Sequence, residues 1–150
     1  MILVVGAGLV PDGGDVLRSR KHVWSRPSAR TDREGAGQLA ELAAARGYAT
    51  SEVPVDAGLH LKTGVTDPGD GRLIATAPVA ARFPSSEVVV VPEEEGYGAN
   101  CLRVRDRLLF PDGYPWVRRK LAVLDYEVVG VEVSEFRKMD GGLTCLSVVW

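Results

Sequence analysis

Apolar and polar positions alternate in short runs along most of the chain, and this pattern predicts many short strands with a few helices between them. Apolar runs at 16–17 and 22–24 flank the polar stretch Arg18–Lys21 and predict a β-hairpin. From Asp32 to Arg46 the spacing becomes helical, because one face carries four apolar side chains: Ala36, Leu39, Ala40 and Ala43. Asp32 is a typical N-cap, and Gly47 is typical of the end of a helix.

The same kinds of element are expected over the rest of the chain. The pattern predicts strands at 49–55, 59–65, 72–76, 87–91, 126–133 and 144–150, a tight turn at 67–71, a hairpin at 101–104 and 107–110, helices at 78–82 and 115–124, and one helical turn at 134–138. The order strand, strand, helix, strand thus occurs three times, from Asp15, Leu59 and Asn100. Because one such unit cannot bury its sheet alone, we expect an α/β (α+β) fold of ββαβ repeats, stacked or arranged as in a propeller.

Composition and charge exclude several classes of protein. The 150 residues suit one domain, and 45% hydrophobic with 25% charged residues is ordinary for a globular protein. A net charge of −2 without a block of Lys and Arg argues against a nucleic-acid partner. Apolar runs such as Val88–Val91 are too short to cross a membrane, and residues 1–10 lack the features of a signal peptide, so we expect a cytoplasmic protein.

Common cofactor patterns are also missing. Two cysteines and two histidines supply neither a disulfide framework nor a zinc site, so we expect no metal. The early Gly-Ala-Gly is followed by no clear helix and is a poor dinucleotide fingerprint.

Three short motifs could bring chemistry together. Asp12-Gly-Gly-Asp15, Leu59-His-Leu-Lys62 and Gly141–Cys145 each open a repeat, and repeats around an axis would place these starts near one another. A thiol needs a nearby base or cation to act as a nucleophile at neutral pH, and His60 is the main candidate. The alternatives are plain: Asp-Gly-Gly-Asp can be a turn, Leu-His-Leu a strand, and Cys145 a small packed hydrophobe.

Several further motifs occur together with these three, in one order. They are DGGDVL at 12–17, SARTD at 28–32 followed by REGAGQLA, LHLKTGVT at 59–66, EEEGYGANC at 93–101, PDGYP at 111–115 and SEFRKMDGGLTCLS at 134–147. In this set the chain from Asp12 onward resembles the dimethylarginine dimethylaminohydrolases. These belong to the guanidino-modifying, pentein-fold superfamily, with arginine deiminases and amidinotransferases. The resemblance implies a pentein-type propeller with about three of five ββαβ modules, so that residues 1–150 form a single, N-terminally truncated domain.

The resemblance also implies roles for four residues. Cys145 matches the nucleophile, His60 the general acid and base, Asp12 the acidic residue that holds the guanidinium or the imidazole, and Arg30 an arginine that binds the substrate's α-carboxylate. The implied reaction hydrolyses an Nω-methylated arginine to citrulline and methylamine or dimethylamine through a Cys-bound thiouronium intermediate. It requires neither a metal nor an organic cofactor.

The chain departs from the family mainly in length. The N-terminal modules, which carry another acidic motif, have no counterpart, and Ser25-Arg26-Pro27 stands where an apolar residue, a glycine and a variable residue are usual. The chain could be part of a longer protein, a short form completed by a second chain (a homo-oligomer or a complementing N-terminal segment), or a decayed, non-catalytic relative. Arginine deiminase or amidinotransferase activity is the neighbouring enzymatic alternative.

Four other sites have no catalytic counterpart. We expect His22 to be a hairpin residue and Cys101 a packed thiol. The run Glu93–Glu95 predicts a solvated face, with a loop near the ligand as the alternative. Asp140 could equally tune the surroundings of Cys145 or serve a turn.

Overall fold

The computed structural model describes residues 11–54, 59–84, 86–124 and 126–147, so residues 1–10, which include the Gly-Ala-Gly, lie outside them. The strands are β1 (Val16–Ser19), β2 (His22–Ser25), β3 (Ala49–Glu52), β4 (Val65–Thr66), β5 (Leu73–Thr76), β6 (Val88–Val91), β7 (Leu102–Val104), β8 (Arg107–Pro111) and β9 (Glu127–Val131). The α-helices are α1 (Arg33–Ala44), α2 (Leu61–Gly64), α3 (Ala77–Ala80), α4 (Pro115–Leu121) and α5 (Ser134–Arg137), with 3-10 turns η1 (Gly13–Asp15) and η2 (Glu93–Ala99).

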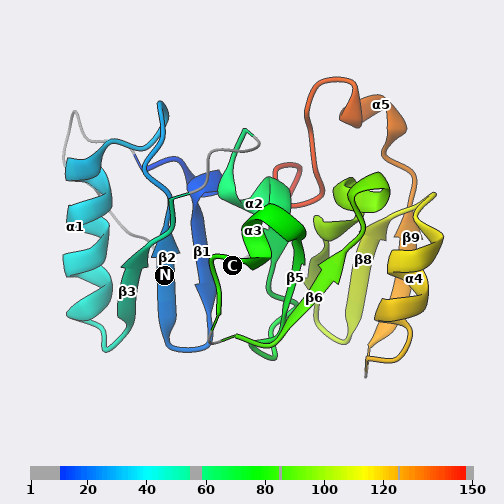
Figure 1. Cartoon of the computed structure of the whole chain (residues 1–150), viewed down its shortest axis with the longest axis horizontal. Helices are drawn as coiled ribbons and strands as arrows, with labels where there is room; N and C mark the ends of the chain where they lie inside the picture. The colour runs from blue at the N-terminus through cyan, green and yellow to red at the C-terminus, as the bar shows by residue number, and fades with distance from the viewer. Residues whose placement is uncertain (1–10, 55–58, 85, 125, 148–150) are drawn as a thin grey trace.

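The strands form three separate three-stranded sheets, ordered β1-β2-β3, β4-β5-β6 and β7-β8-β9 (Figure 1). In each sheet the first two strands are antiparallel, and the third is parallel to the second. A parallel return requires a crossover, which α1, α3 and α4 supply in turn. The chain therefore contains three ββαβ modules, as the repeated order of elements predicts.

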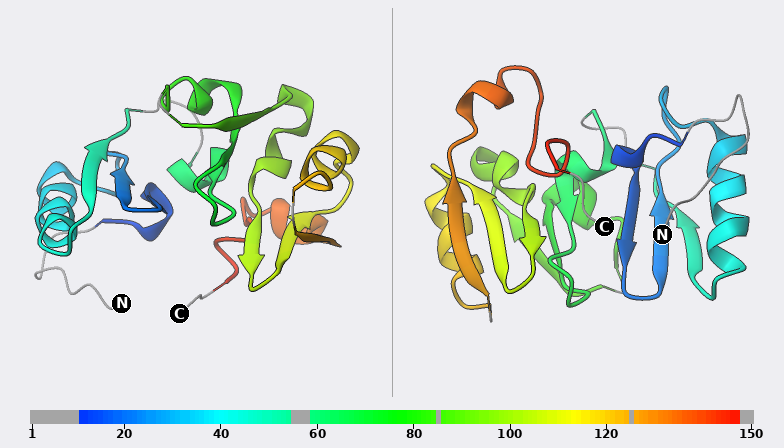
Figure 2. Two further views of the ribbon diagram at one scale, coloured as in Figure 1. Left: turned by 90° about the horizontal axis from the view of Figure 1, so that it is seen from below. Right: turned by 180° about the vertical axis from the view of Figure 1, so that it is seen from behind.

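The three modules lie along an arc, which is clearest when the molecule is seen from below (Figure 2). One hydrophobic cluster joins modules 1 and 2, with Leu17 and Trp24 packed against Leu73, Val79 and Phe83. A second cluster joins modules 2 and 3 through residues such as Ile74, Val91, Phe110 and Leu121. The core thus lies largely between modules, which explains why one module could not bury its sheet alone.

Most predicted elements are confirmed with boundaries shifted by a few residues. The hairpins at 16–24 and 101–110, the helix capped by Asp32 and the turn at 134–138 are all present. Asp32 accepts a hydrogen bond from the Gly35 N–H at 2.6 Å, and Gly47 has the positive φ of 76° that ends the helix.

The strand predicted at 59–65 is wrong, because Leu61–Gly64 forms α2 and only Val65–Thr66 is strand. The Leu61 N–H donates to the buried Asp15 carboxylate at 3.0 Å, and the Thr63 hydroxyl accepts from the His60 N–H at 3.3 Å. These contacts satisfy the free N–H groups at the start of a helical turn, and Asp15 comes from far away in the sequence. The second module therefore begins at Val65 and not at Leu59.

The last predicted strand is also wrong in its described part. Residues 144–147 belong to a turn in which the N–H groups of Cys145 and Leu146 both donate to the Gly142 carbonyl, at 3.0 and 3.1 Å. Residues 148–150 lie outside the described part of the chain.

None of the helices in the described ranges is long and apolar enough to span a membrane.

Candidate active site

A buried carboxylate, Asp15, joins the segments that carry the candidate residues. It is fully buried and accepts hydrogen bonds from the Ser28 hydroxyl at 2.6 Å, the Thr31 hydroxyl at 3.1 Å and the Leu61 N–H at 3.0 Å. The Arg26 guanidinium lies 3.9 Å away and is also buried. Arg26, at the position where the family resemblance leads us to expect a glycine, thus faces a buried charge of opposite sign. Asp15 therefore fixes η1, the 28–32 loop and α2 relative to one another.

The side chains of Asp12, His60 and Arg30 lie next to one another, each on one of the three segments that Asp15 connects. The His60 Nε2 lies 3.1 Å from the Asp12 Oδ2, and the Arg30 Nη1 lies 3.7 Å from the same oxygen. The Gly14 N–H donates to the other carboxylate oxygen at 2.8 Å. This hydrogen bond, together with the charges of His60 and Arg30, holds the pKa of Asp12 below its ordinary value despite partial burial. The Asp12 carboxylate is therefore kept ionised next to the imidazole.

The close approach of His60 depends on a glycine. A Cβ atom at Gly14 would lie 2.6 Å from the His60 Cγ, closer than real Cβ contacts allow. At Gly13, by contrast, an added Cβ would meet nothing within 4 Å. The second glycine of the Asp-Gly-Gly-Asp motif thus makes room for the imidazole, which goes beyond a turn role.

Cys145 lies on the C-terminal turn, exposed, and Asn100 fastens that turn to α2. The Asn100 side chain donates to the Lys62 carbonyl at 2.7 Å and to the Thr144 hydroxyl at 3.0 Å, and it accepts from the Thr144 N–H at 3.1 Å. Asn100 is buried, with an exposed fraction of 3%. A Cβ at Gly142 would lie 2.9 Å from the Asn100 Cγ, so the Gly-Gly pair before Thr144 admits this contact. Asn100 therefore holds both the turn that carries Cys145 and the helix that follows His60.

The outer side of the same turn is held by aromatic side chains. The Tyr97 hydroxyl donates to the Gly141 carbonyl. The Arg137 guanidinium lies 5.1 Å from the Tyr97 ring centroid, and its Nη1 donates to the Tyr114 hydroxyl at 2.7 Å. Burial, and to a smaller extent the nearby Tyr114, raises the pKa of Tyr97, so this hydroxyl remains a donor at neutral pH.

Lys62 is a polar residue of the site for which the sequence predicted no role. Burial lowers the pKa of its ammonium group, while the charges of Cys145 and Asp12 act in the opposite direction. Lys62 is thus electrostatically linked to both the thiol and the carboxylate. In the sequence, its position two residues after His60, in Leu-His-Leu-Lys, is the feature that could have suggested a place in the site.

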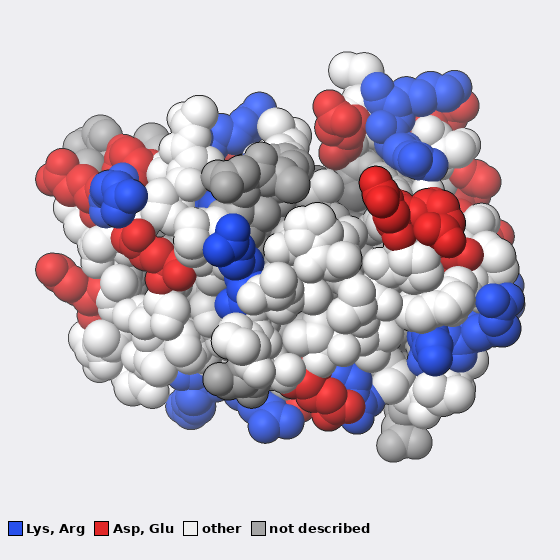
Figure 3. All heavy atoms as spheres, in the orientation of Figure 1, with Lys and Arg blue, Asp and Glu red and all other residues white. Residues whose placement is uncertain are grey.

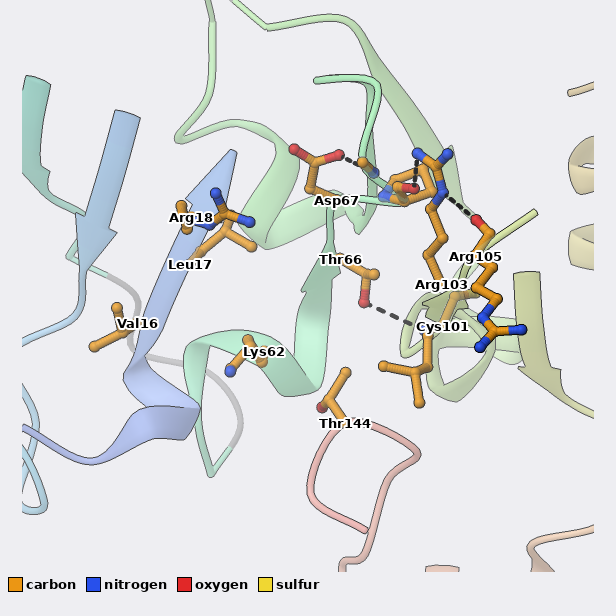
Figure 4. A pocket seen from close by; sticks show the side chains of 13 residues that line it. Val16, Leu17, Arg18, Lys62, Thr66, Asp67, Cys101, Arg103, Arg105 and Thr144 are labelled. Atoms are coloured by element: carbon orange, nitrogen blue, oxygen red, sulfur yellow. Dashed lines mark hydrogen bonds between the residues drawn. The ribbon is translucent and has the colours of Figure 1, made fainter. Parts of the chain in front are cut away.

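A cavity of about 570 Å³ extends from this group between the first strands of the three modules. Lys62 and Thr144 line its end near the Cys145 turn, and Arg103 and Arg105 line the other (Figure 4). Arg103 is held there by hydrogen bonds to the carbonyls of Arg105, at 2.8 Å, and Pro68, at 3.2 Å. The walls are therefore rich in cations, with Asp67 as a carboxylate among the lining residues.

The structure brings three of the four predicted site residues into direct contact and links the fourth indirectly. Asp12, His60 and Arg30 form one cluster, whereas Cys145 is connected to it through Asn100 and Lys62. Among the hydrogen bonds of the described residues, none joins the Cys145 Sγ to the imidazole. The described side chains also include no group of three or more His, Cys, Asp or Glu that could hold a metal ion.

The structure also shows what surrounds the residues for which the sequence predicted no catalytic role. His22 stacks on Trp24 at 4.0 Å, within β2, and Cys101 is fully buried, with its thiol pKa raised by burial to about 12. Asp140 adopts a positive φ of 57° in an exposed turn. Glu93 and Glu94 are exposed, as predicted for a solvated face. Glu95 differs, because its carboxylate accepts hydrogen bonds from two N–H groups in the first turn of α4, at 2.9 and 3.0 Å.

Comparison with known proteins supports one family. No family model matches the chain. It is 38% identical over 139 residues to the N(G),N(G)-dimethylarginine dimethylaminohydrolase of Pseudomonas aeruginosa, which covers 91% of the chain and 55% of the relative. The enzyme of the same name from Streptomyces coelicolor is 38% identical over 140 residues, with 91% and 53% covered. The chain therefore spans about half the length of the curated relatives it matches.

Solved structures agree with this comparison. A Cys-to-Ser mutant of the Pseudomonas aeruginosa enzyme, complexed with citrulline, superposes with a TM-score of 0.91 at 36% identity over 97% of this chain and 58% of that one. An arginine dihydrolase domain from cyanobacteria (TM-score 0.80, 19% identity, 96% and 57% covered) and an amidinotransferase from Microseira wollei (0.76, 14%, 89% and 45%) share the fold. The chain is thus a pentein-type protein and a homologue of the dimethylarginine dimethylaminohydrolase family, of whose matched members it spans about half the length.

Proposed function

We propose that the chain acts in the hydrolysis of a guanidino C–N bond, converting an Nω-methylated arginine to citrulline and methylamine or dimethylamine. The observation that carries the proposal is the ion pair of Asp12 with His60 and Arg30, with the Cys145 turn anchored beside it by Asn100. The relatives named above carry dimethylaminohydrolase in their names, and one was crystallised with citrulline.

In the first half-reaction, the Cys145 thiolate attacks the guanidinium carbon and forms a C–S bond. Protonated His60 gives its proton to the amine nitrogen as the C–N bond breaks, so dimethylamine leaves as a neutral molecule. The product on the enzyme is an S-alkylthiouronium. The Asp12 carboxylate, kept ionised by the Gly14 N–H, is suited to hold the cationic substrate and the imidazolium.

In the second half-reaction, neutral His60 takes a proton from water as the water oxygen bonds to the thiouronium carbon. Collapse of the tetrahedral intermediate breaks the C–S bond, and the hydroxyl proton passes to solvent, where the free amine takes it up. Citrulline leaves, and the thiolate and protonated His60 are restored. The sum is one methylarginine and one water giving citrulline and one amine, with no change of oxidation state. Arg30 is half exposed and pairs only loosely with Asp12, so its guanidinium can bind a substrate carboxylate instead.

The test is to incubate the purified chain with asymmetric dimethylarginine and to measure citrulline. Cys145→Ser should abolish the product, while Cys101→Ser, which changes a fully buried thiol that donates to the Gly98 carbonyl, should leave it unchanged. Parallel incubation with arginine separates this activity from that of an arginine deiminase, which would release ammonia. Absence of citrulline with a folded chain would refute the proposal for this chain.

The second candidate is a non-catalytic or partner-completed module of the same fold. It is favoured by two observations: no hydrogen bond joins the Cys145 Sγ to the imidazole among the described residues, and the chain spans only about half of its relatives. A folded chain that makes no citrulline alone but does so when a second polypeptide is added would identify the partner-completed form.

A further inference from the structure

A further group of charged side chains surrounds the cavity between the first strands of the modules. Arg18 extends from β1 on one side, and Arg103 and Arg105 extend from β7 and the turn after it on the other (Figure 4). Lys62 of α2 lines the end near the Cys145 turn. Four cationic groups from distant parts of the sequence therefore border one space of about 570 Å³.

These four cations form no ion pair with any residue in the described part of the chain. Arg72 and Arg107, by contrast, each pair with a glutamate on the surface, at 2.7 and 2.9 Å. Among the described lining residues the one carboxylate belongs to Asp67, whose Oδ1 already accepts from the N–H groups of Gly69 at 2.5 Å and Gly71 at 3.2 Å. Because like charges around one space repel one another, an anion is the complement that these walls lack.

The Arg103 guanidinium is held in a fixed position at the edge of this cavity. Its Nε donates to the Arg105 carbonyl at 2.8 Å, its Nη1 donates to the Pro68 carbonyl at 3.2 Å, and the group lies 4.9 Å from the Tyr126 ring centroid. A Cβ at Gly69 would lie 2.5 Å from the same Nη1, so the glycine makes room for the guanidinium. Among the hydrogen bonds of the described residues none uses the Nη2, which can therefore donate to a ligand without first losing freedom of movement.

The side chains of Arg18, Arg105 and Lys62 keep all their donors available. No hydrogen bond of the described residues uses a nitrogen of these three side chains. Both arginines are exposed, whereas Lys62 is partly buried, and burial lowers the pKa of its ammonium group. Apolar lining residues such as Val16 and Leu17 strengthen the field of these charges, because walls of low dielectric constant screen charge less than water does.

The arrangement suits an anion that carries more than one charged group. Arg103 and Arg105 lie at one end of the cavity and Lys62 lies at the other, so a ligand that contacts both ends needs charged groups along its length. Guanidinium groups bind phosphate oxygens through paired N–H···O bonds, and three of the four cations are arginines. The volume of about 570 Å³ falls within the range of roughly 300–1,000 Å³ that is usual for small-molecule sites.

We propose that this cavity binds a small anion with a chain of two or more phosphate groups, either inorganic or part of a larger molecule such as a nucleotide. Arg103 and Arg105 hold the phosphate group at one end, Lys62 holds the group at the other end, and Arg18 neutralises the chain from the side of β1. Binding requires only side chains of this chain, and it does not depend on the proposed hydrolysis.

The test is isothermal titration calorimetry of the full 150-residue chain with inorganic triphosphate and, in parallel, with a nucleoside triphosphate. The wild type should bind one triphosphate per chain, and more weakly as the salt concentration rises. Arg18→Gln and Arg105→Gln each remove one charge and no side-chain hydrogen bond, so each should fold like the wild type and lower the affinity at least about fivefold. The ratio of the affinities for the two ligands shows whether the nucleoside also contacts the protein.

A second basic surface supplies the matched control. Arg118–Lys120 belong to α4, and basic side chains are visible over this helix in Figure 3. Arg119→Gln removes the same charge at an exposed position that does not line the cavity, so its affinity should stay within about twofold of the wild type. Thermal melts check that all variants fold. Absence of saturable binding at millimolar triphosphate, unchanged affinity in Arg18→Gln and Arg105→Gln, or an equal loss in Arg119→Gln would each overturn the proposal.

Discussion

Replacing Asn100 by alanine should both destabilise the protein and uncouple Cys145 from the Asp12–His60 pair. The Asn100 side chain makes three hydrogen bonds, one to the Lys62 carbonyl and two to Thr144. No other side-chain hydrogen bond of the described residues joins α2 to the Cys145 turn. Without it, that turn keeps its own backbone hydrogen bonds, the contact at Gly141 and the burial of Leu143, but loses its side-chain link to α2.

The magnitude follows from the hydrogen bonds that are lost. Each contributes about 0.5–1.5 kcal/mol net, and truncation leaves the partly buried Lys62 carbonyl and Thr144 N–H unpaired, so we expect a loss of about 2–4 kcal/mol in the free energy of unfolding. For a chain of this size that loss lowers the melting temperature by about 5–12 °C.

The functional effect is measured by alkylation of Cys145 with two reagents, neutral iodoacetamide and a cationic amidine that Asp12 can attract. In the wild type the amidine should react faster than iodoacetamide. In Asn100→Ala the ratio of the two rates should fall about tenfold, because the released turn no longer holds Cys145 in place relative to Asp12. A tenfold change corresponds to about 1.4 kcal/mol in the activation free energy. Mass spectrometry after proteolysis assigns the modified thiol.

Cys101→Ala is the matched control, since it removes a neighbouring buried side chain that touches neither Thr144 nor α2 through a side-chain hydrogen bond. It should lower stability and leave the ratio of rates unchanged. If Asn100→Ala loses stability with an unchanged ratio, the anchor is structural only, and if neither quantity changes, the reasoning is wrong.

Three further changes probe other contacts. Gly14→Ala should cost about 1–3 kcal/mol, because its Cβ would lie 2.6 Å from the His60 ring, whereas Gly13→Ala should stay within about 0.5 kcal/mol; thermal melts of the pair compare them directly. Glu95→Gln should lower stability by about 1 kcal/mol because it weakens two bonds to the start of α4, and an unchanged urea midpoint would contradict this. The pKa of Asp12 in the folded state lies below its ordinary value of 3.8, so ionised Asp12 stabilises the fold above pH 3.8. This stabilisation disappears as the pH falls through the folded-state pKa. Asp12→Asn should therefore lose less stability in acid than the wild type does.

The sequence determined the local elements and their order wherever the signal lies within a few residues. Asp32 and Gly47 define α1, and the alternation in 101–110 defines a hairpin, because caps, turns and side-chain period are local properties. The repeated order of elements then gave three ββαβ modules, and the motifs around Cys145, His60 and Asp12 pointed to the family.

Only the tertiary structure decided how these residues meet. The segment 59–65 looks like a strand because Leu-His-Leu alternates, yet it forms α2 since the distant Asp15 satisfies its first N–H. Asn100 and Glu95 give no local sign of their tasks, because their partners lie more than 20 residues away in sequence and become neighbours only when modules pack. Alternation and capping act over one turn or one strand pair, whereas the site is a product of contacts between segments far apart in the sequence, which no short stretch contains.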